Sequence, residues 1–458
     1  MTAMPSGRDA MDGMPATLST QLIDALFAQR RAGIPAAIRR KTRLHIADNL
    51  AIATAARETS ALARQLPWSF QTGGQLAPAM VAFVMSAYGH ILDFDDIHDF
   101  ARVHPTAVTL PAALAAARAG GASGADVVDA VALSNELLCR LGSIWRPIGR
   151  GPGSDWFLSQ LFGYFAAALS ACIVLRMNAE NTRSALGLAY MQAAGGKEAG
   201  FGVGGNARAI YPAFASMGGV NAALLALAGV VGPPTALDGA AGFFPLYFGR
   251  NLDSAQRAQL LRADAWMWSD TCIKPWPSCR ISHPYVYAAQ RLREDMGRDR
   301  IERIVISVNG SAAKLCAPLA QRLRPQTLQD AKYSIPFMVA FTLVHGEVSL
   351  NTLTDASLHD AHVLDMAQRI ELVQVDTDEP GLPPAAITLY GGGASRTVAG
   401  PFNPPDSEDA VRTKFRSCFD FAGLGASAHA AWIAVDALDQ GGVGDLLELM
   451  RVEPVGQS

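Results

Sequence analysis

The sequence predicts a mainly helical protein with a second, smaller α/β domain inserted before the chain returns to helix. Residues 18–265 are alanine- and leucine-rich stretches separated by glycine-rich loops, and alanine favours helix and close helix packing. The composition changes near Trp266, after which short runs with strand composition alternate with helical runs. With 458 residues, half of them apolar, the chain is long enough for two or three domains.

The first expected elements are a leader and a long helical region. Residues 1–17 lack an apolar signal core and are expected to form a flexible leader. The first part of the helical domain is expected over 18–265, because apolar stretches at 126–141, 158–177 and 217–230 are broken by glycine and proline.

A smaller α/β domain is expected over 266–405. The chain then regains a helical pattern over 406–440, which we expect to pack back on the first domain, and 441–458 is expected to be a flexible tail. Within the α/β domain we expect strands at 301–309, 369–375 and 386–390 and helices at 285–295 and 335–345.

Charge and composition exclude several classes of partner. The formal net charge is −3 and there is no basic stripe, which argues against nucleic acid. Six cysteines without paired spacing are typical of the reduced thiols of a cytoplasmic protein. The longest apolar run, 162–175, is shorter than the roughly 20 residues that a membrane span needs. We therefore expect a cytoplasmic protein with no membrane partner.

The most informative segment is 90–104, which packs four aspartates and three histidines into 15 positions of a chain that is only 17% charged. Buried polar groups cost free energy unless they are paired, so such a cluster normally lines a cavity. A carboxylate near a histidine raises its pKa and fixes its tautomer, which makes Asp93 and His104 candidates for function. A His/Asp metal site is the alternative, but the spacing fits no firm signature and no metal is predicted.

Two familiar motifs occur without the context that they require. Residues 95–99 fit the DDxxD pattern by which prenyl and terpene synthases hold Mg²⁺, but no second metal motif follows. Gly200, Gly202 and Gly205 match a dinucleotide fingerprint, but an alanine-rich helix precedes them instead of a strand. A loop that binds a carboxylate at a helix N-terminus is favoured, and no cofactor is predicted.

A second polar segment lies at 274–284. Prolines and apolar residues flank Lys274, which predicts a part-buried lysine that loses its proton readily and serves as acid or base; the alternative is a surface lysine. Cys279 is either a nucleophile or a small core residue. Arg280 is a further candidate for binding substrate, and His283 either contacts substrate or caps the helix that follows.

Arg208 and Tyr211 follow the glycine loop. Arginine suits a fixed clamp on a carboxylate and is a poor base, because it hardly deprotonates. The alternative is a solvated arginine beside a core tyrosine.

These blocks, in this order, resemble the MmgE/PrpD family, which includes 2-methylcitrate dehydratase, cis-aconitate decarboxylase and iminodisuccinate epimerase. The family implies a helical domain built from both chain ends, a smaller α/β lid domain, a site between them, a homodimer, and no organic cofactor or metal. The resemblance spans roughly residues 20 to 430 and rests on blocks at 90–112, 185–193, 208–220, 274–284 and 330–337.

The resemblance also assigns residues. Asp93, His104 and Lys274 match the family's active-site aspartate, histidine and lysine. Cys279 falls where the decarboxylases have a histidine and many bacterial members have a cysteine.

Three departures weigh against decarboxylation of cis-aconitate. Phe157 stands where a histidine is common, and Arg208 stands where a lysine is common, with Tyr211 in place of a nearby histidine. One extra residue also separates Asp93 from His104.

The predicted chemistry is the formation of a carbanion next to a carboxylate of a small di- or tricarboxylate. We expect His104, oriented by Asp93, to take the α-proton, with Arg208 and Lys274 holding carboxylates and enolate charge and Tyr211 acting as the acid. A dehydratase-type lyase is the leading prediction; an isomerase or epimerase, a decarboxylase and a non-catalytic carboxylate-binding homologue are the alternatives. The remaining expected contacts or helpers are Cys279, Arg280, His283, Arg102 and Arg146.

Overall fold

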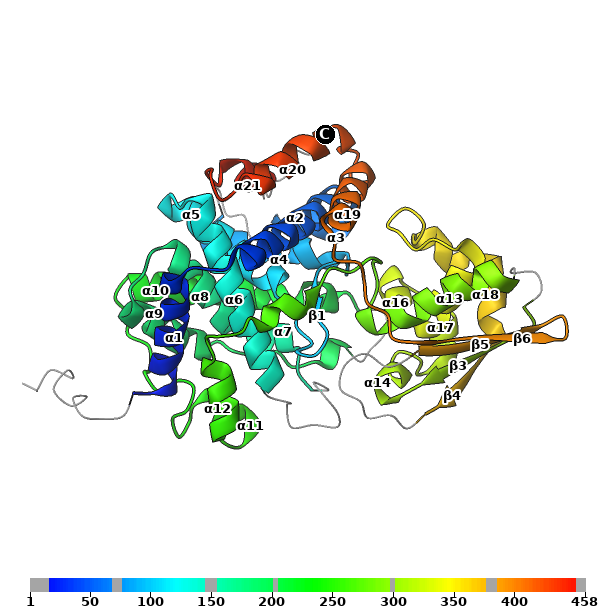
Figure 1. Ribbon diagram of the computed structural model, residues 1–458, viewed down its shortest axis with the longest axis horizontal. Helices are drawn as coiled ribbons and strands as arrows, with labels where there is room; N and C mark the ends of the chain where they lie inside the picture. The colour runs from blue at the N-terminus through cyan, green and yellow to red at the C-terminus, as the bar shows by residue number, and fades with distance from the viewer. Residues whose placement is uncertain are drawn as a thin grey trace, which may run out of the picture.

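The computed structural model describes residues 16–67, 76–144, 155–200, 205–296, 301–375 and 385–449. These residues form a large helical domain and a smaller α/β domain, which lie side by side in Figure 1. The predicted fold class is therefore confirmed.

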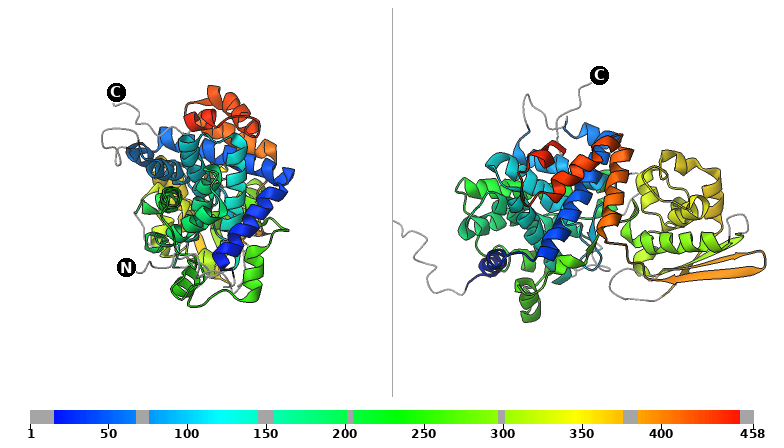
Figure 2. Two further views of the ribbon diagram at one scale, coloured as in Figure 1. Left: turned by 90° about the vertical axis from the view of Figure 1, so that its left-hand side faces the viewer. Right: turned by 45° about the horizontal axis from the view of Figure 1, so that its top comes forward.

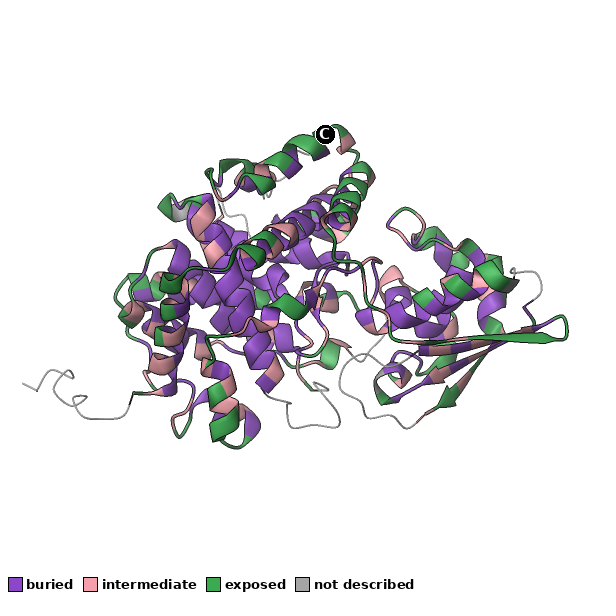
Figure 3. Cartoon of the chain, in the orientation of Figure 1, coloured by how far each residue is buried: buried purple, intermediate pink, exposed green. Residues whose placement is uncertain are grey.

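Helix α10 (Tyr211–Leu227) lies at the centre of the helical domain, packed against α4 (Pro78–Ile91), α5 (Thr106–Gly120), α8 (Gly163–Val174) and α9 (Ala179–Tyr190). All twelve residues of α8 are buried, and Figure 3 shows a largely buried centre. The remaining helices up to residue 261 are α1 (Leu18–Ala32), α2 (Ala36–Thr59), α3 (Ala61–Gln65), α6 (Gly124–Ile144), α7 (Leu158–Leu161), α11 (Phe243–Phe248) and α12 (Ser254–Leu261).

One segment, 207–227, is long and apolar enough to cross a membrane by length and composition alone. It includes α10, and 61% of its most apolar window is buried against the neighbouring helices. In this fold it is a core helix.

The C-terminal part of the chain returns to the helical domain. Helix α19 (Glu408–Phe421) packs along α2, as Figures 1 and 2 show, and α20 (Ala428–Asp436) packs against both. The predicted flexible tail at 441–458 is wrong for its first part, because α21 (Gly444–Leu449) is folded there; residues 450–458 lie outside the described residues. Six residues are too few to show a helical repeat in the sequence, and one side chain of this helix, Leu446, is buried.

Replacement of Leu446 by alanine is expected to lower the free energy of unfolding by about 2–4 kcal/mol, because Leu446 is fully buried in the main core. Urea unfolding measures this loss. The neighbouring exposed Asp445 is the matched control, and Asp445→Ala should cost less than about 1 kcal/mol. An equally small loss for Leu446→Ala would mean that the end of the chain adds nothing to the core.

The α/β domain is built on a four-stranded sheet in the order β4-β3-β5-β6. Strand β3 (Arg303–Val308) runs parallel to β4 (Ile370–Gln374) and antiparallel to β5 (Ala385–Gly391). Strand β6 (Ala394–Gly400) forms a hairpin with β5 and was not predicted, because its mostly exposed residues lack an apolar alternation. The helices of this domain are α13 (His283–Met296), α14 (Gly310–Ala313), α15 (Leu319–Leu323), α16 (Leu328–Lys332), α17 (Ile335–His345) and α18 (Ala361–Gln368).

Candidate active site

A two-stranded antiparallel ladder joins the two polar segments that the sequence singles out. Strand β1 (Ile97–His98) pairs with β2 (Thr271–Cys272), although about 170 residues separate them in the chain. The ladder places the loop after α4 beside the segment that begins at Lys274. The polar segments therefore form one site where the two domains meet.

Three lysines fix the loop after α4. Lys332 donates to the carbonyl of residue 92 at 2.7 Å, Lys274 to that of 93 at 3.1 Å, and Lys414 to that of 94 at 2.7 Å. These lysines come from α16, the segment after β2, and α19. Cations at a helix C-terminus offset its partial negative charge, so both domains hold the same helix end. Burial lowers the pKa of Lys332 to about 8.

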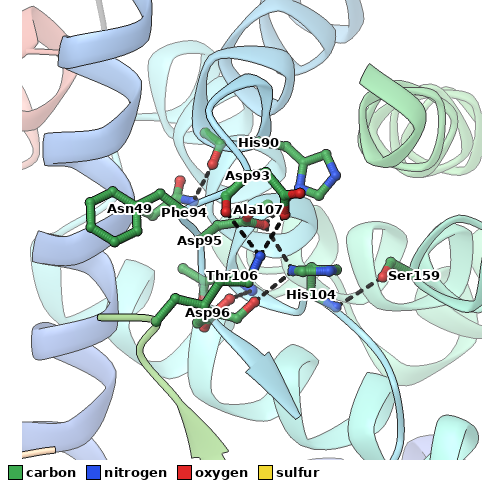
Figure 4. Close-up of polar contacts among 12 residues, drawn as sticks. Asn49, His90, Asp93, Phe94, Asp95, Asp96, His104, Thr106, Ala107 and Ser159 are labelled. Atoms are coloured by element: carbon green, nitrogen blue, oxygen red, sulfur yellow. Dashed lines mark hydrogen bonds and ion pairs between the residues drawn. The ribbon is translucent and has the colours of Figure 1, made fainter. Parts of the chain in front are cut away.

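His104 is held by the two aspartates that follow Asp93. Its Nδ1 lies 2.8 Å from the backbone carbonyl of Asp96 and 3.1 Å from Oδ2 of Asp95, and its backbone N–H donates to Ser159 at 2.8 Å (Figure 4). Both oxygens accept, so Nδ1 carries the proton and Nε2 is the nitrogen available to a substrate. The prediction that Asp93 orients His104 is therefore wrong.

One carboxylate oxygen of Asp95 contacts two histidines at once. Its Oδ2 lies 2.8 Å from Nδ1 of His90 as well as 3.1 Å from His104. Burial disfavours the charged form of Asp95, but the two imidazoles hold its pKa well below its usual value. Burial lowers the pKa of His90 despite this carboxylate. These three residues also lie close enough together to share a metal ion, so the absence of a metal stays a prediction.

Asp93 forms a buried ion pair with Lys274 instead. Lys274 Nζ lies 2.6 Å from Asp93 Oδ1, and both side chains are almost fully buried. Burial opposes both charges, yet the pairing raises the pKa of Lys274 and lowers that of Asp93. The expectation that Lys274 loses its proton readily is therefore corrected: Lys274 is a fixed cation.

The DDxxD carboxylates point to different partners. Asp96 accepts from His45 at 2.7 Å and from Thr106, whereas Asp99 accepts from Arg280 at 2.8 and 3.0 Å. Asp95 contacts His90 and His104, as described above. The three side chains therefore do not converge as a shared ligand set.

A cavity with about 800 Å³ of empty space, partly open to solvent, lies at this site. Its described lining contains five basic residues and two acidic ones, which leaves an excess of three positive charges. The lining residues are Asp93, Ile97, Asp99, Arg102, His104, Trp156, Phe157, Leu158, Lys197, Arg208, Tyr211, Lys274, Cys279, Arg280, Ile281 and Tyr333.

Tyr211 lies in a stack of rings inside this cavity. Its ring stacks on Phe157 at 4.1 Å and meets His90 edge-on at 4.9 Å. Its hydroxyl lies 3.3 Å from Oγ of Ser159, the same atom that accepts from the His104 backbone. Burial raises the pKa of Tyr211, so the phenol stays protonated at neutral pH.

The guanidinium carbon Cζ of Arg208 lies over the ring of Tyr333, 3.5 Å from its centroid, and Arg208 Nη1 donates to the Gly200 carbonyl at 3.0 Å. Among the described residues, its buried Nε has no hydrogen-bond partner. A substrate carboxylate at this point would satisfy that donor.

Most predicted site residues line the cavity, with two exceptions. His283 does not: its ring is buried against Trp276, and Nε2 lies 3.3 Å from the Ser278 carbonyl. The predicted substrate contact of His283 is therefore not supported by its position. Arg146 lies outside the described residues. Cys279 lines the cavity, and burial raises its thiol pKa, which weakens the nucleophile alternative.

Sequence reasoning missed Lys197 and Tyr333. Lys197 lies in a glycine-rich loop with no local motif around it. Tyr333 belongs to the block 330–337, which carried the resemblance but gave no residue a role. Only the tertiary fold brings these two residues to Phe157 and Arg208.

Replacement of Asp95 by asparagine is expected to lower kcat about 100-fold with a smaller change in KM, because His104 loses the carboxylate that stabilises its imidazolium form, while the Asp96 carbonyl still holds Nδ1. Steady-state kinetics measures this split. Asp96→Asn is the matched control, because Asp96 contacts His104 through its backbone carbonyl; it should cost stability and a smaller part of kcat. Equal kcat losses in the two variants would contradict the role of Asp95.

Comparison with known proteins shows the family to which this chain belongs. The chain belongs to the MmgE/PrpD family: the family's N-terminal domain matches residues 20–255, and its C-terminal domain matches 276–440. The resemblance in the sequence is thereby confirmed.

Two curated relatives narrow the class of activity. The chain is 26% identical over 371 residues to the cis-aconitate decarboxylase-like protein oryM of Aspergillus oryzae (strain ATCC 42149 / RIB 40), covering 74% of this chain and 75% of the relative. It is 24% identical over 385 residues to the cis-aconitate decarboxylase of Homo sapiens, covering 80% and 76%. Family and relatives support an enzyme with a lyase or decarboxylase function at the level of the family.

Proposed function

We propose that the protein is a cofactor-independent lyase that forms a carbanion next to a carboxylate of a small di- or tricarboxylate. The observation that carries the proposal is the fixed tautomer of His104. With Nδ1 held by Asp95 and the Asp96 carbonyl, Nε2 accepts the α-proton of a substrate bound in the cavity.

Fixed cations stabilise the charge that develops when the proton leaves. Lys274 stays protonated because of Asp93, and Arg208 has a buried Nε–H that no described residue accepts from. As the α-proton moves to His104, negative charge spreads onto the neighbouring carboxylate, where such cations lower the barrier. Lys274 supplies charge and does not act as the base.

Dehydration is the leading reaction. The electron pair of the carbanion forms a carbon–carbon double bond as the β-hydroxyl leaves, and Tyr211 donates the proton that makes the leaving group water. Burial keeps Tyr211 protonated, and its place in the cavity beside His90 supports that role. His104 and Tyr211 then exchange protons with solvent for the next turnover.

Decarboxylation is the second candidate, because both relatives described above are named for it. Loss of CO₂ leaves a carbanion that a protonated group must quench, which the same residues can do. Phe157 lines the cavity as an apolar ring where the family often has a histidine, which favours dehydration. An epimerase shares the first step and differs only in which face receives the proton.

The test is a panel of 2-methylcitrate, citrate, cis-aconitate, malate, tartrate and iminodisuccinate followed by proton NMR and CO₂ release. A new vinyl signal from a hydroxylated acid supports the dehydratase, and CO₂ release supports the decarboxylase. If no acid reacts but several raise the melting temperature, the enzyme proposal fails in favour of a carboxylate-binding homologue. A homodimer and a cytoplasmic location remain predictions.

A further inference from the structure

Ser159 contacts both the residue proposed as base and the residue proposed as acid. It lies in α7, two residues after Phe157, and its side chain is fully buried. Its Oγ accepts the backbone N–H of His104 at 2.8 Å (Figure 4) and lies 3.3 Å from the hydroxyl oxygen of Tyr211. One small side chain therefore connects the two proton-transfer residues of the site.

The direction of the second hydrogen bond follows from where each hydroxyl lies. Tyr211 lines the cavity, whereas Ser159 does not. In the described part of the chain, only the Tyr211 oxygen is placed to accept the hydrogen of Ser159, because the His104 N–H is itself a donor. If Tyr211 were the donor, the hydrogen of Ser159 would be buried without an acceptor, which costs free energy. Ser159 is therefore the donor, and the hydrogen of Tyr211 is left to point into the cavity.

The ring of Tyr211 is fixed independently of this hydrogen bond. It stacks on Phe157 with centroids 4.1 Å apart and meets His90 edge-on at 4.9 Å. These contacts fix the plane of the ring, but the phenolic hydrogen can still rotate about its C–O bond. The hydrogen bond from Ser159 restricts that rotation.

The same hydrogen bond helps the phenol to release its proton. Burial raises the pKa of Tyr211, and the hydrogen bond with Ser159 opposes this rise. A donor to the phenolic oxygen stabilises the phenolate that remains once the proton has been transferred.

We propose that Ser159 is a positioning residue that directs the O–H of Tyr211 toward the leaving hydroxyl of the substrate. In this step the electron pair of the carbanion forms the double bond, the bond to the hydroxyl oxygen breaks, and the Tyr211 proton makes that oxygen water. Ser159 then donates to the phenolate until solvent returns its proton. This inference rests on the proposed function, because it assumes that Tyr211 is the acid of a dehydration. It adds a residue outside the cavity that no sequence motif indicates.

The experiment is proton NMR in D₂O with citrate, 2-methylcitrate, malate and tartrate, for wild type, Ser159→Ala, Tyr211→Phe and the double variant. Two rates are measured for each: formation of a vinyl product, and exchange of the α-proton for deuterium in recovered substrate. Loss of the acid slows the first rate and gives the carbanion time to take up deuterium. The ratio of exchange to dehydration therefore reports on Tyr211 and not on the base.

Ser159→Ala should slow dehydration about 3- to 10-fold, the value of one hydrogen bond, and should raise this ratio. Tyr211→Phe should slow dehydration about 100-fold or more and raise the ratio further. The double variant should have the ratio of Tyr211→Phe, because Ser159 acts through the hydroxyl that phenylalanine lacks.

Ser170 supplies the matched control for Ser159. It is equally buried, lies in α8 and donates to the Thr109 carbonyl at 2.9 Å, and it does not line the cavity. Ser170→Ala should lose stability as Ser159→Ala does and leave the ratio of exchange to dehydration unchanged. Thermal melting of both variants confirms that they are folded.

The outcomes separate this inference from the proposed function. If Ser159→Ala dehydrates as wild type does, or slows exchange and dehydration equally, Ser159 does not direct Tyr211, while the proposed function stands. A ratio in the double variant above that of Tyr211→Phe also overturns it. If Tyr211→Phe keeps wild-type dehydration, Tyr211 is not the acid and the inference falls, although α-proton exchange still supports the carbanion. If wild type dehydrates none of these acids, the proposed dehydration fails and the inference falls with it.

Discussion

Replacement of His104 by alanine is expected to lower kcat by about 10²- to 10⁴-fold, the contribution of a positioned general base. The ring is held at Nδ1 by Asp95 and the Asp96 carbonyl, and Nε2 is the nitrogen left for the α-proton. Alanine removes this base while His90 still pairs with Asp95. Steady-state kinetics with any acid that wild type turns over measures the loss.

His98 is the matched control for His104. It lies in the same segment and is buried, with Nε2 3.0 Å from the Met267 carbonyl, but it does not line the cavity. His98→Asn should cost stability and leave kcat within a few-fold of wild type. If His104→Ala instead keeps full turnover, His104 is not the base.

Replacement of Lys274 by methionine is expected to lower the free energy of unfolding by about 3–5 kcal/mol and to reduce kcat/KM sharply. The substitution leaves Asp93 as a buried charge without its cation, which is among the costliest single changes in a protein. It also removes a cation from the site of developing negative charge. Urea unfolding and kinetics measure the two effects.

A double-mutant cycle with Asp93→Asn isolates the pair. The double variant should recover much of the stability lost in Lys274→Met, because no buried charge is left uncompensated. It should not recover kcat/KM, since the cation stays absent. Additive losses in stability would contradict a direct Lys274–Asp93 interaction.

The same pair sets a pH dependence of stability. The folded pKa of Asp93 is lowered, so its contribution is present above its unfolded pKa and is lost as the pH falls through the folded value. The folded pKa of Lys274 is raised, so its contribution is lost only as the pH rises through that value. In Lys274→Met, Asp93 loses its cation, so the deficit should shrink as the pH is lowered from 7 to 5.

The helical pattern of the sequence predicted most of the fold. The helix at 335–345 matches α17, and the strands at 301–309 and 386–390 contain most of β3 and β5. Strand β6 was not predicted because its mostly exposed residues show no apolar alternation, and helix α21 was not predicted because six residues are too few to show a helical repeat.

The sequence predicted most residues of the site, but not which of them contact one another. Asp93 has a left-handed φ of 54°, so it and Asp95 take different partners two residues apart. No spacing rule tells which carboxylate reaches the histidine and which the lysine. The place of Lys197 in the site could not be predicted for a related reason: only tertiary contacts bring its neighbours Phe157 and Arg208 to it.

Proton NMR of the carboxylate panel in D₂O, with wild type and His104→Ala, tests most directly whether His104 removes the proton next to a carboxylate. We expect wild type to remove the proton at the carbon next to a carboxylate, seen as its loss in a dehydrated product or as its exchange for deuterium in recovered substrate or a reprotonated product. We expect His104→Ala to lose this removal. Turnover by wild type that leaves this proton in place, or equal loss of it with His104→Ala, would contradict a carbanion formed by His104.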